Sequence, residues 1–416
     1  MTPTARVAYV VLVLALVALA VPGAVSFTLL ALLAIATAVD VAIAHHRVRV
    51  RRTVPRILAR GIPASLSVEA DADAPGRIEI RQAQPADVTI EPSVGHGSLA
   101  ARLVAHRRGE AVLPPVTARC RGPLGLGRCT FVGEGEAHLL VYPDVVAAQR
   151  VVVALRRGQF RDPGLRARGP LGLGTDFEAI RDYLPDDDVR QINWTASERA
   201  GRPMSNVYRI EQDRDVVCLL DVGRLMSAPL DHRSTRLDVA IDAVTMVALV
   251  ADELGDRCGV TAFDADIRGQ LRPRRNGGRR VVRAILEMEP KAVDSDYDLA
   301  FRSVTGGKRS LILVFTDLVD AAAARSLIAS VPVLARRHAV IVASVRDPDL
   351  DGALRREPAS TSDVYASAVA IDVLDERRRI ATRLEHAGAR VVEAPAAVLG
   401  EACVRAYLRL KARARL

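Results

Sequence analysis

The stretch Asp215-Val216-Val217-Cys218-Leu219-Leu220-Asp221 places five consecutive apolar residues between two aspartates. A continuous apolar run of this length is typical of a strand buried on both faces of a parallel sheet. Apolar and helical patterns then alternate towards the C-terminus. The expected strands cover residues 216–221, 259–263, 311–317, 339–345 and 390–393, and the expected helices cover residues 237–254, 279–288, 363–386 and 401–415. This alternation predicts a doubly wound α/β domain over residues 213–416, with ligand sites at the carboxyl ends of the strands.

The N-terminal region is strongly apolar. Residues 7–39 contain no charged side chain and are interrupted by Pro22-Gly23. One helix of this length would measure about 50 Å, which exceeds the roughly 30 Å hydrocarbon core of a bilayer. A turn at Pro22-Gly23 therefore predicts a transmembrane hairpin within residues 1–50. A cleaved signal peptide is the alternative, because Ala18-Leu19-Ala20 resembles a cleavage site behind an apolar core.

Cations follow the second apolar stretch. Residues 45–52 contain four arginines and two histidines, whereas the turn between the two stretches has no charge. The positive-inside rule then predicts a multi-pass protein of the cell membrane whose ends and soluble domains are cytoplasmic. The same cations can contact anionic lipid head groups, although setting the topology is sufficient to explain them.

Residues 51–145 show short alternating runs, such as 64–69 and 77–81, separated by Pro, Gly and Asp. This pattern predicts the strands of a small β-sandwich. Such a module most often serves as a spacer or a binding module.

The composition argues against several functions. Lys and Arg number 58 and Asp and Glu 49, so the net charge of +9 does not indicate a dedicated nucleic-acid surface. Only 4% of the residues are aromatic, which is too few for a platform that stacks bases. The five cysteines have no C-x-x-C spacing, so neither a zinc site nor a disulfide framework is expected.

A seven-residue segment occurs twice, since Arg121-Gly122-Pro123-Leu124-Gly125-Leu126-Gly127 is repeated at residues 168–174. Neither copy has the G-x-G-x-x-G spacing of a phosphate-binding loop. We therefore interpret both copies as turns.

The stretch after the second copy carries the densest polar pattern, reading Asp176-Phe177-Glu178-Ala179-Ile180-Arg181-Asp182-Tyr183-Leu184-Pro185-Asp186-Asp187-Asp188-Val189-Arg190-Gln191-Ile192-Asn193-Trp194. Pro185 sets a turn, the aspartates after it can cap a short helix, and Arg190 can pair with one of them. Ile192 and Trp194 are expected to be buried anchors. The stretch has no histidine or cysteine, so it predicts packing between domains or a partner surface rather than an active site.

This stretch resembles the signature of the domain-of-unknown-function 58 family, and the order of hairpin, β-module, connector (residues 146–212) and α/β domain resembles that family over almost the whole chain. The residues that carry the resemblance are Gly172, Gly174, Asp176, Phe177, Arg181, Tyr183, Pro185, Asp187, Asp188, Arg190, Ile192, Asn193 and Trp194. The resemblance implies a bacterial protein that works with MoxR-type AAA+ ATPases on client proteins. The candidates for docking a partner are Asp176, Arg181, Tyr183, Asp187, Asp188, Arg190, Asn193 and Trp194.

The last domain resembles a von Willebrand factor A domain, which binds a metal through Asp-x-Ser-x-Ser after its first strand and an aspartate after its fourth. Here the first motif reads Asp221-Val222-Gly223-Arg224-Leu225, without either hydroxyl, while Asp317 keeps the second place. Ser295 is a possible further oxygen ligand. We expect weak magnesium binding or none, hence no cofactor, and a salt bridge in which Arg224 replaces the charge of the ion.

Together these patterns predict a membrane-anchored interaction or scaffold protein that is not an enzyme. The family resemblance implies that it acts as an adaptor for a MoxR-type ATPase in the maturation of proteins or complexes. The eight histidines form no H-E-x-x-H motif, and no G-x-S-x-G elbow is present. Two alternatives stay open. One is a metal-dependent adhesion module outside the cell, which requires an intact metal motif and the opposite orientation, and the other is an uncharacterised hydrolase.

Overall fold

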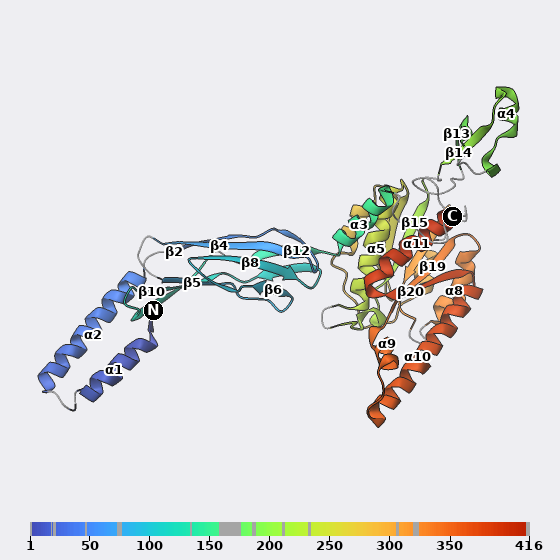
Figure 1. Cartoon of the computed structure of the whole chain (residues 1–416). Helices are drawn as coiled ribbons and strands as arrows, with labels where there is room; N and C mark the ends of the chain where they lie inside the picture. The colour runs from blue at the N-terminus through green and yellow to red at the C-terminus, as the bar shows by residue number, and fades with distance from the viewer. Residues whose placement is uncertain are drawn as a thin grey trace. The chain divides into compact units, whose positions relative to one another are not determined.

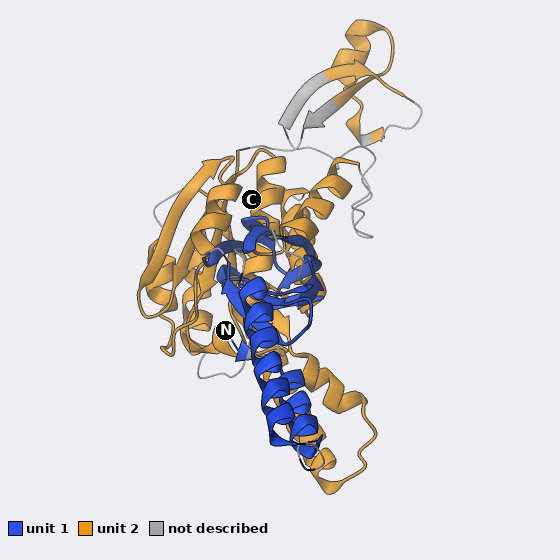
Figure 2. Cartoon of the chain, turned by 90° about the vertical axis from the view of Figure 1, so that its left-hand side faces the viewer, with its two compact units in different colours: residues 1–142 blue, residues 143–416 orange. Residues whose placement is uncertain are grey.

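The computed structural model describes residues 2–17, 19, 22–45, 48–72, 77–133, 135–157, 176–184, 189–209, 213–231, 234–304, 308–318 and 324–412. The chain divides into two compact units, Met1–Tyr142 and Pro143–Leu416 (Figure 2). The first unit contains the apolar N-terminus and the β-module. The second contains the signature and a mixed α/β domain.

Two apolar helices, α1 (Ala5–Val17) and α2 (Gly23–Ala44), form a hairpin in the first unit (Figure 1). Within the described residues, α2 is the one helix that is both long and apolar enough to cross a membrane. Helix α1 has 13 residues and is about 20 Å long, which is short for a bilayer. The expected pair of transmembrane spans is therefore not supported, and one possible membrane helix remains.

The start of the chain returns to the β-module. Strand β1 (Thr2–Pro3) pairs with β11 (Gly127–Val132), and the Thr4 hydroxyl donates to the carbonyl oxygen of Gly125 at 2.7 Å. Both ends of the helical hairpin are thus attached to the same module.

The first copy of the repeated segment receives a carboxylate from α2. Asp40 is fully buried, and its two oxygens accept hydrogen bonds from the backbone N–H groups of Leu124 at 2.8 Å, Leu126 at 2.7 Å and Gly127 at 2.7 Å. A Cβ atom at Gly122 would lie 2.3 Å from Asp40 Cγ, so glycine is required for this approach. The loop is therefore an anion-binding nest whose anion comes from the chain itself. The second copy lies outside the described residues.

The β-module consists of two sheets around one core. The larger, nine-stranded sheet has the order β1-β11-β10-β5-β7-β8-β4-β2, with β6 paired to β8, and the smaller has the order β3-β12-β9. Besides β1 and β11, the strands are β2 (Val48–Thr53), β3 (Ile57–Ala59), β4 (Ala64–Ala72), β5 (Arg77–Arg81), β6 (Val88–Glu91), β7 (Val94–His96), β8 (Ser98–Ala105), β9 (Gly109–Leu113), β10 (Thr117–Arg121) and β12 (Ala137–Tyr142). Alternate residues point inwards, as in β8, where Leu99 and Leu103 are buried. Residues 48–52 of the expected juxtamembrane run belong to β2.

The second unit is built on a six-stranded sheet with the order β17-β16-β15-β18-β19-β20. Its strands are β15 (Asp215–Asp221), β16 (Arg257–Phe263), β17 (Ile267–Arg275), β18 (Ser310–Phe315), β19 (Ala339–Arg346) and β20 (Ala389–Pro395). All neighbouring pairs are parallel except β16 and β17.

Helices cover both faces of this sheet (Figure 1). Alternate residues of β15 enter opposite cores, with Cys218 on one side and Leu219 on the other. The first core is closed by α3 (Val145–Arg156), α5 (Arg236–Glu253), α6 (Gly278–Ile285) and α11 (Leu399–Ala412), and the second by α7 (Tyr297–Arg302), α8 (Arg325–Ala335) and α10 (Thr361–His386). Helix α9 (Pro348–Arg355) packs against α10.

Helix α3 corrects the expected connector. Ala148, Val151 and Leu155 follow helical spacing and are buried in the first core of the α/β domain. The first part of residues 146–212 therefore belongs to that domain. The signature forms a small hairpin in which β13 (Asp176–Asp182) pairs antiparallel with β14 (Met204–Arg209), with the turn η1 (Val189–Gln191) and helix α4 (Trp194–Ala200) between them. We call residues 176–209 the signature hairpin.

We expect Asp40→Ala to loosen the glycine loop, because three backbone N–H groups lose the buried carboxylate that accepts their hydrogen bonds. Trypsin should then cleave the detergent-solubilised protein faster at Arg121 and Arg128, which flank the loop. Asp71→Ala removes an exposed carboxylate of β4 and is the matched control. Equal cleavage rates in both variants and the natural protein would contradict this role of Asp40.

Candidate functional site

The carboxyl ends of β15 and β18 adjoin the point where the strand order reverses, since β16 lies on one side of β15 and β18 on the other. Open α/β sheets bind ligands at such a switch point. Asp221 ends β15, and Thr316 and Asp317 directly follow β18. The expected metal-site aspartates are therefore on neighbouring strands at this edge.

Asp221 is buried and accepts four hydrogen bonds. Its Oδ1 receives the Ser295 hydroxyl at 2.5 Å and the Gly223 N–H at 2.8 Å. Its Oδ2 receives the Tyr297 hydroxyl at 2.9 Å and the Thr316 hydroxyl at 2.7 Å. The structure thus joins Ser295 to Asp221, as the sequence suggested, but with the hydroxyl as a hydrogen-bond donor.

Tyr297 remains a proton donor in this arrangement. Burial raises the pKa of its phenol well above the usual value, and the negative charge of Asp221 raises it further. The phenol therefore stays protonated at physiological pH and continues to stabilise the Asp221 carboxylate.

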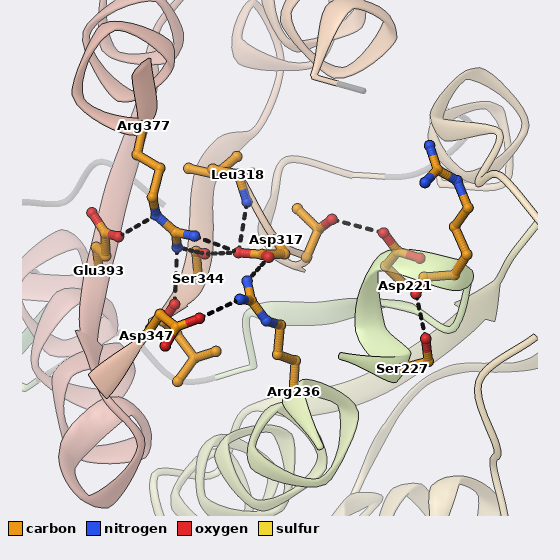
Figure 3. A network of polar contacts seen from close by, with 12 residues as sticks. Asp221, Ser227, Arg236, Asp317, Leu318, Ser344, Asp347, Arg377 and Glu393 are labelled. Atoms are coloured by element: carbon orange, nitrogen blue, oxygen red, sulfur yellow. Dashed lines mark hydrogen bonds and ion pairs between the residues drawn. The ribbon is translucent and has the colours of Figure 1, made fainter. Parts of the chain in front are cut away.

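Asp317 is the centre of a second, ionic arrangement (Figure 3). Its Oδ1 contacts Arg377 Nη1 at 3.1 Å and accepts hydrogen bonds from the Ser344 hydroxyl at 3.1 Å and the Leu318 N–H at 2.9 Å. Its Oδ2 forms an ion pair with Arg236 Nη1. Both oxygens of this buried carboxylate therefore contact a guanidinium group.

Each of the two arginines has a second carboxylate partner. Arg236 Nη2 contacts Asp347 Oδ2 at 2.8 Å, and Arg377 Nε contacts Glu393 Oε1 at 2.8 Å. Burial lowers the pKa of Arg236, as does the charge of Arg377, while Asp347 acts in the opposite direction. Guanidinium groups nevertheless remain charged in proteins. Two cations and three carboxylates thus form one network at the strand ends.

Arg224 does not have the expected role. Its Nε pairs with Asp294, and its side chain is about half exposed, so the prediction that it would neutralise the site carboxylates was wrong. Two helices supply the guanidinium groups at Asp317. Arg236 is the first residue of α5, and Arg377 lies inside α10. No motif linked these residues to the strand ends, and Arg377 lies within the charged run Asp375-Glu376-Arg377-Arg378-Arg379, where nothing distinguishes it from its neighbours.

The described residues at the strand ends do not form a set of metal ligands. Across the part of the chain that the structure describes, no group of three or more His, Cys, Asp or Glu side chains is arranged to hold a metal ion. Asp317 meets cations on both of its oxygens, and Asp221 meets hydrogen-bond donors. These contacts are better suited to a structural network of ion pairs than to the binding of a hard divalent cation.

Four of the expected docking residues are described in the signature hairpin, namely Arg181, Tyr183, Asn193 and Trp194. Arg181 is exposed and donates to the carbonyl oxygen of Asp182 at 2.9 Å, and Tyr183 is half-buried. Asn193 caps α4 by accepting the Ala196 N–H at 2.9 Å. Asp187 and Asp188 lie outside the described residues, as do the side chains of Asp176 and Arg190.

Trp194 lies on the surface of the signature hairpin. Its side chain is 71% exposed, so the prediction that it is a buried anchor was wrong, and Ile192 is only half-buried. As the first residue of a seven-residue helix that contributes no buried residue, Trp194 has no core to enter. Among the described side chains of this hairpin, Ile180, Leu184 and Val189 are also large, apolar and exposed.

Comparison with known proteins identifies the family. The model of the family described as "Protein of unknown function DUF58" matches residues 179–386, half of the 416 residues. The match begins in the signature hairpin and includes both aspartates and both arginines of the strand-end site. This chain therefore belongs to the DUF58 family.

Two similar proteins are "Uncharacterized protein Mb1516" of Mycobacterium bovis and "Uncharacterized protein Rv1480" of Mycobacterium tuberculosis. Each is 26% identical over 186 residues, which cover 42% of this chain and 56% of the relative. The chain thus spans little more than half the length of the curated relatives that it matches.

We expect Arg377→Ala to destabilise the α/β domain by about 3–5 kcal/mol, because it leaves a buried carboxylate with one of its cations missing. Arg378→Ala removes the neighbouring exposed arginine and should change the stability little. Urea unfolding of the solubilised protein, followed by circular dichroism, compares the two. Similar midpoints for both variants would show that the ionic network is not a major source of stability.

Titration calorimetry with magnesium chloride is expected to show no saturable binding in the micromolar range. Magnesium requires near-octahedral oxygen ligands, whereas Asp317 is occupied by two guanidinium groups. Asp317→Ala should leave the heats unchanged. A micromolar isotherm that disappears in this variant would prove that the site exchanges its arginines for metal.

Proposed function

We propose that this protein is a membrane-anchored interaction protein that serves as an adaptor between a MoxR-type AAA+ ATPase and client proteins. The observation that carries the proposal is the exposed Trp194 on the signature hairpin. Tryptophan is enriched among the residues that dominate binding energy at protein interfaces. An aromatic side chain with this exposure, on a hairpin with further exposed apolar residues, fits a docking surface.

The domain architecture supports the same proposal. If the six strands of the second unit's sheet are numbered by their order along the chain, they lie side by side in the order 3-2-1-4-5-6. The third strand is antiparallel, and helices cover both faces of the sheet. This arrangement favours a doubly wound, von Willebrand factor A-like domain. Because Asp317 is neutralised by arginines, such a domain would recognise partners without a metal. A metal-dependent adhesion module fits these contacts less well.

The contacts of the strand-end hydroxyls favour a non-enzymatic role. Within the described residues, the Ser295 hydroxyl donates to Asp221, and no histidine contacts either residue. A serine nucleophile requires a base oriented towards its hydroxyl by a third group. The hydrolase alternative would therefore need a nucleophile elsewhere.

We place the β-module and the α/β domain in the cytoplasm of a bacterial cell, with the α1–α2 hairpin inserted into the membrane from that side. The attachment of β1 to β11 keeps the start of the chain next to the β-module, and the arginines of β2 follow α2 directly.

Protease added to intact spheroplasts is expected to leave the β-module and the α/β domain uncut, whereas lysis should expose both. The arginines that follow α2 resist translocation across the membrane. Digestion without lysis would place these units outside the cell and favour the adhesion alternative.

Trp194→Ala should reduce copurification of an AAA+ ATPase with the tagged protein by at least about tenfold, as expected for an interface tryptophan. Tyr365→Ala is the matched control, because Tyr365 is an aromatic residue of α10 with nearly the same exposure, 70% against 71%. Circular dichroism verifies that both variants are folded. An undiminished ATPase yield with folded Trp194→Ala would rule out the signature hairpin as the docking surface.

A further inference from the structure

A cleft of about 730 Å³ opens in the β-module. One wall is formed by residues 51–54 and Arg56, and the other by residues 135–139. Its volume is within the roughly 300–1,000 Å³ typical of ligand clefts. A single phosphate or carboxylate would fill only a small part of this space.

Both walls of the cleft are edges of strands. Strand β2 ends the larger sheet, and among the described residues no strand pairs with its outer side. Strand β12 pairs with β3 only through Leu140–Tyr142, so residues 137–139 have no partner on that side in the described part of the chain. Unpaired strand edges present rows of N–H and C=O groups that can pair with another chain. Two such edges therefore border one cleft.

The cleft is also cationic. Three arginines but only one acidic residue, Glu136, line it. Arg51 and Arg56 are exposed and have no ion pair within the described residues. The third, Arg52, donates to the carbonyl oxygens of Pro114 and Gly135, each at 2.7 Å, and so connects the two walls.

We propose that this cleft binds an extended acidic segment of a partner protein, which adds as a strand between β2 and β12 and places carboxylates on Arg51 and Arg56. Main-chain hydrogen bonds would supply affinity, as in other cases of strand addition. Arginine forks bind carboxylates with two parallel hydrogen bonds. Alternate side chains of the segment would contact the partly buried apolar residues Val54 and Ala137.

The length of the wall sets the size of the segment. Four residues of β-strand span about 13 Å, so the part of the segment inside the cleft is about four residues long. The favoured sequence alternates acidic and apolar residues. This site lies in the β-module and uses none of the residues of the signature hairpin, so the test below is independent of ATPase docking.

Fluorescence anisotropy tests the proposal with full-length protein in nanodiscs of neutral phosphatidylcholine. The probe is a fluorescein-labelled heptapeptide of alternating Val and Asp. We expect saturable binding that the double variant Arg51→Ala/Arg56→Ala weakens at least about tenfold. Arg49→Ala removes an exposed arginine of the same strand that does not line the cleft, and it should change affinity less than about twofold.

Three further measurements separate the proposal from a general anion site. A heptapeptide methylated at alternate backbone nitrogens should not bind, because it cannot pair with both edges. Inorganic polyphosphate should compete weakly. If the double alanine variant is misfolded by circular dichroism, Arg51→Lys/Arg56→Lys should still lower the affinity several-fold, because lysine lacks the fork. Equal binding of the methylated peptide, or displacement of the probe by polyphosphate as effective as displacement by the unlabelled peptide, would overturn the proposal. Unchanged affinity in the folded arginine variants would also overturn it, as would a failure of the peptide to bind the natural protein.

Discussion

The negative charge of the buried Asp317 carboxylate must be neutralised inside the protein, and helices on both faces of the α/β sheet supply the cations that do so. A buried carboxylate is tolerated only when cations and hydrogen-bond donors surround it closely. Arg236 supplies one cation from α5 and Arg377 another from α10, while Ser344 contributes a hydroxyl from β19. Since these helices lie on opposite faces of the sheet, the carboxylate connects both layers at the switch point.

The parallel strands could be predicted from sequence because burial on both faces leaves a continuous apolar run, as in 216–221. Strand β17 was not predicted, because as an antiparallel edge strand it carries arginines and is only partly buried at alternate positions. Helix α8 was also missed, since it is short and contains Pro332, a residue disfavoured inside helices. Local patterns thus identify the centre of the sheet better than its edge and its outer layer.

The site could be predicted only in part, for a similar reason. Two expected strands end at Asp221 and Asp317, and Ser295 lies in a loop that the sequence pattern identifies. Their positions at one edge of the sheet could be predicted from the order of strands and helices. The partners of Asp317 come from α5 and α10, far apart in the chain, and depend on how those helices pack. Trp194 was misjudged because an aromatic residue beside Ile192 suggests a core, whereas the signature hairpin is too small to bury one.

The three hydrogen bonds to Asp40 couple helix α2 mechanically to the β-module. A flexible linker between a helix and the following domain would allow the two to rotate independently. Here α2 meets the β-module through a buried carboxylate and a glycine loop, and β1 adds a second attachment. Helix α2 and the β-module are therefore coupled mechanically, and a torque applied to the β-module would also turn the helix.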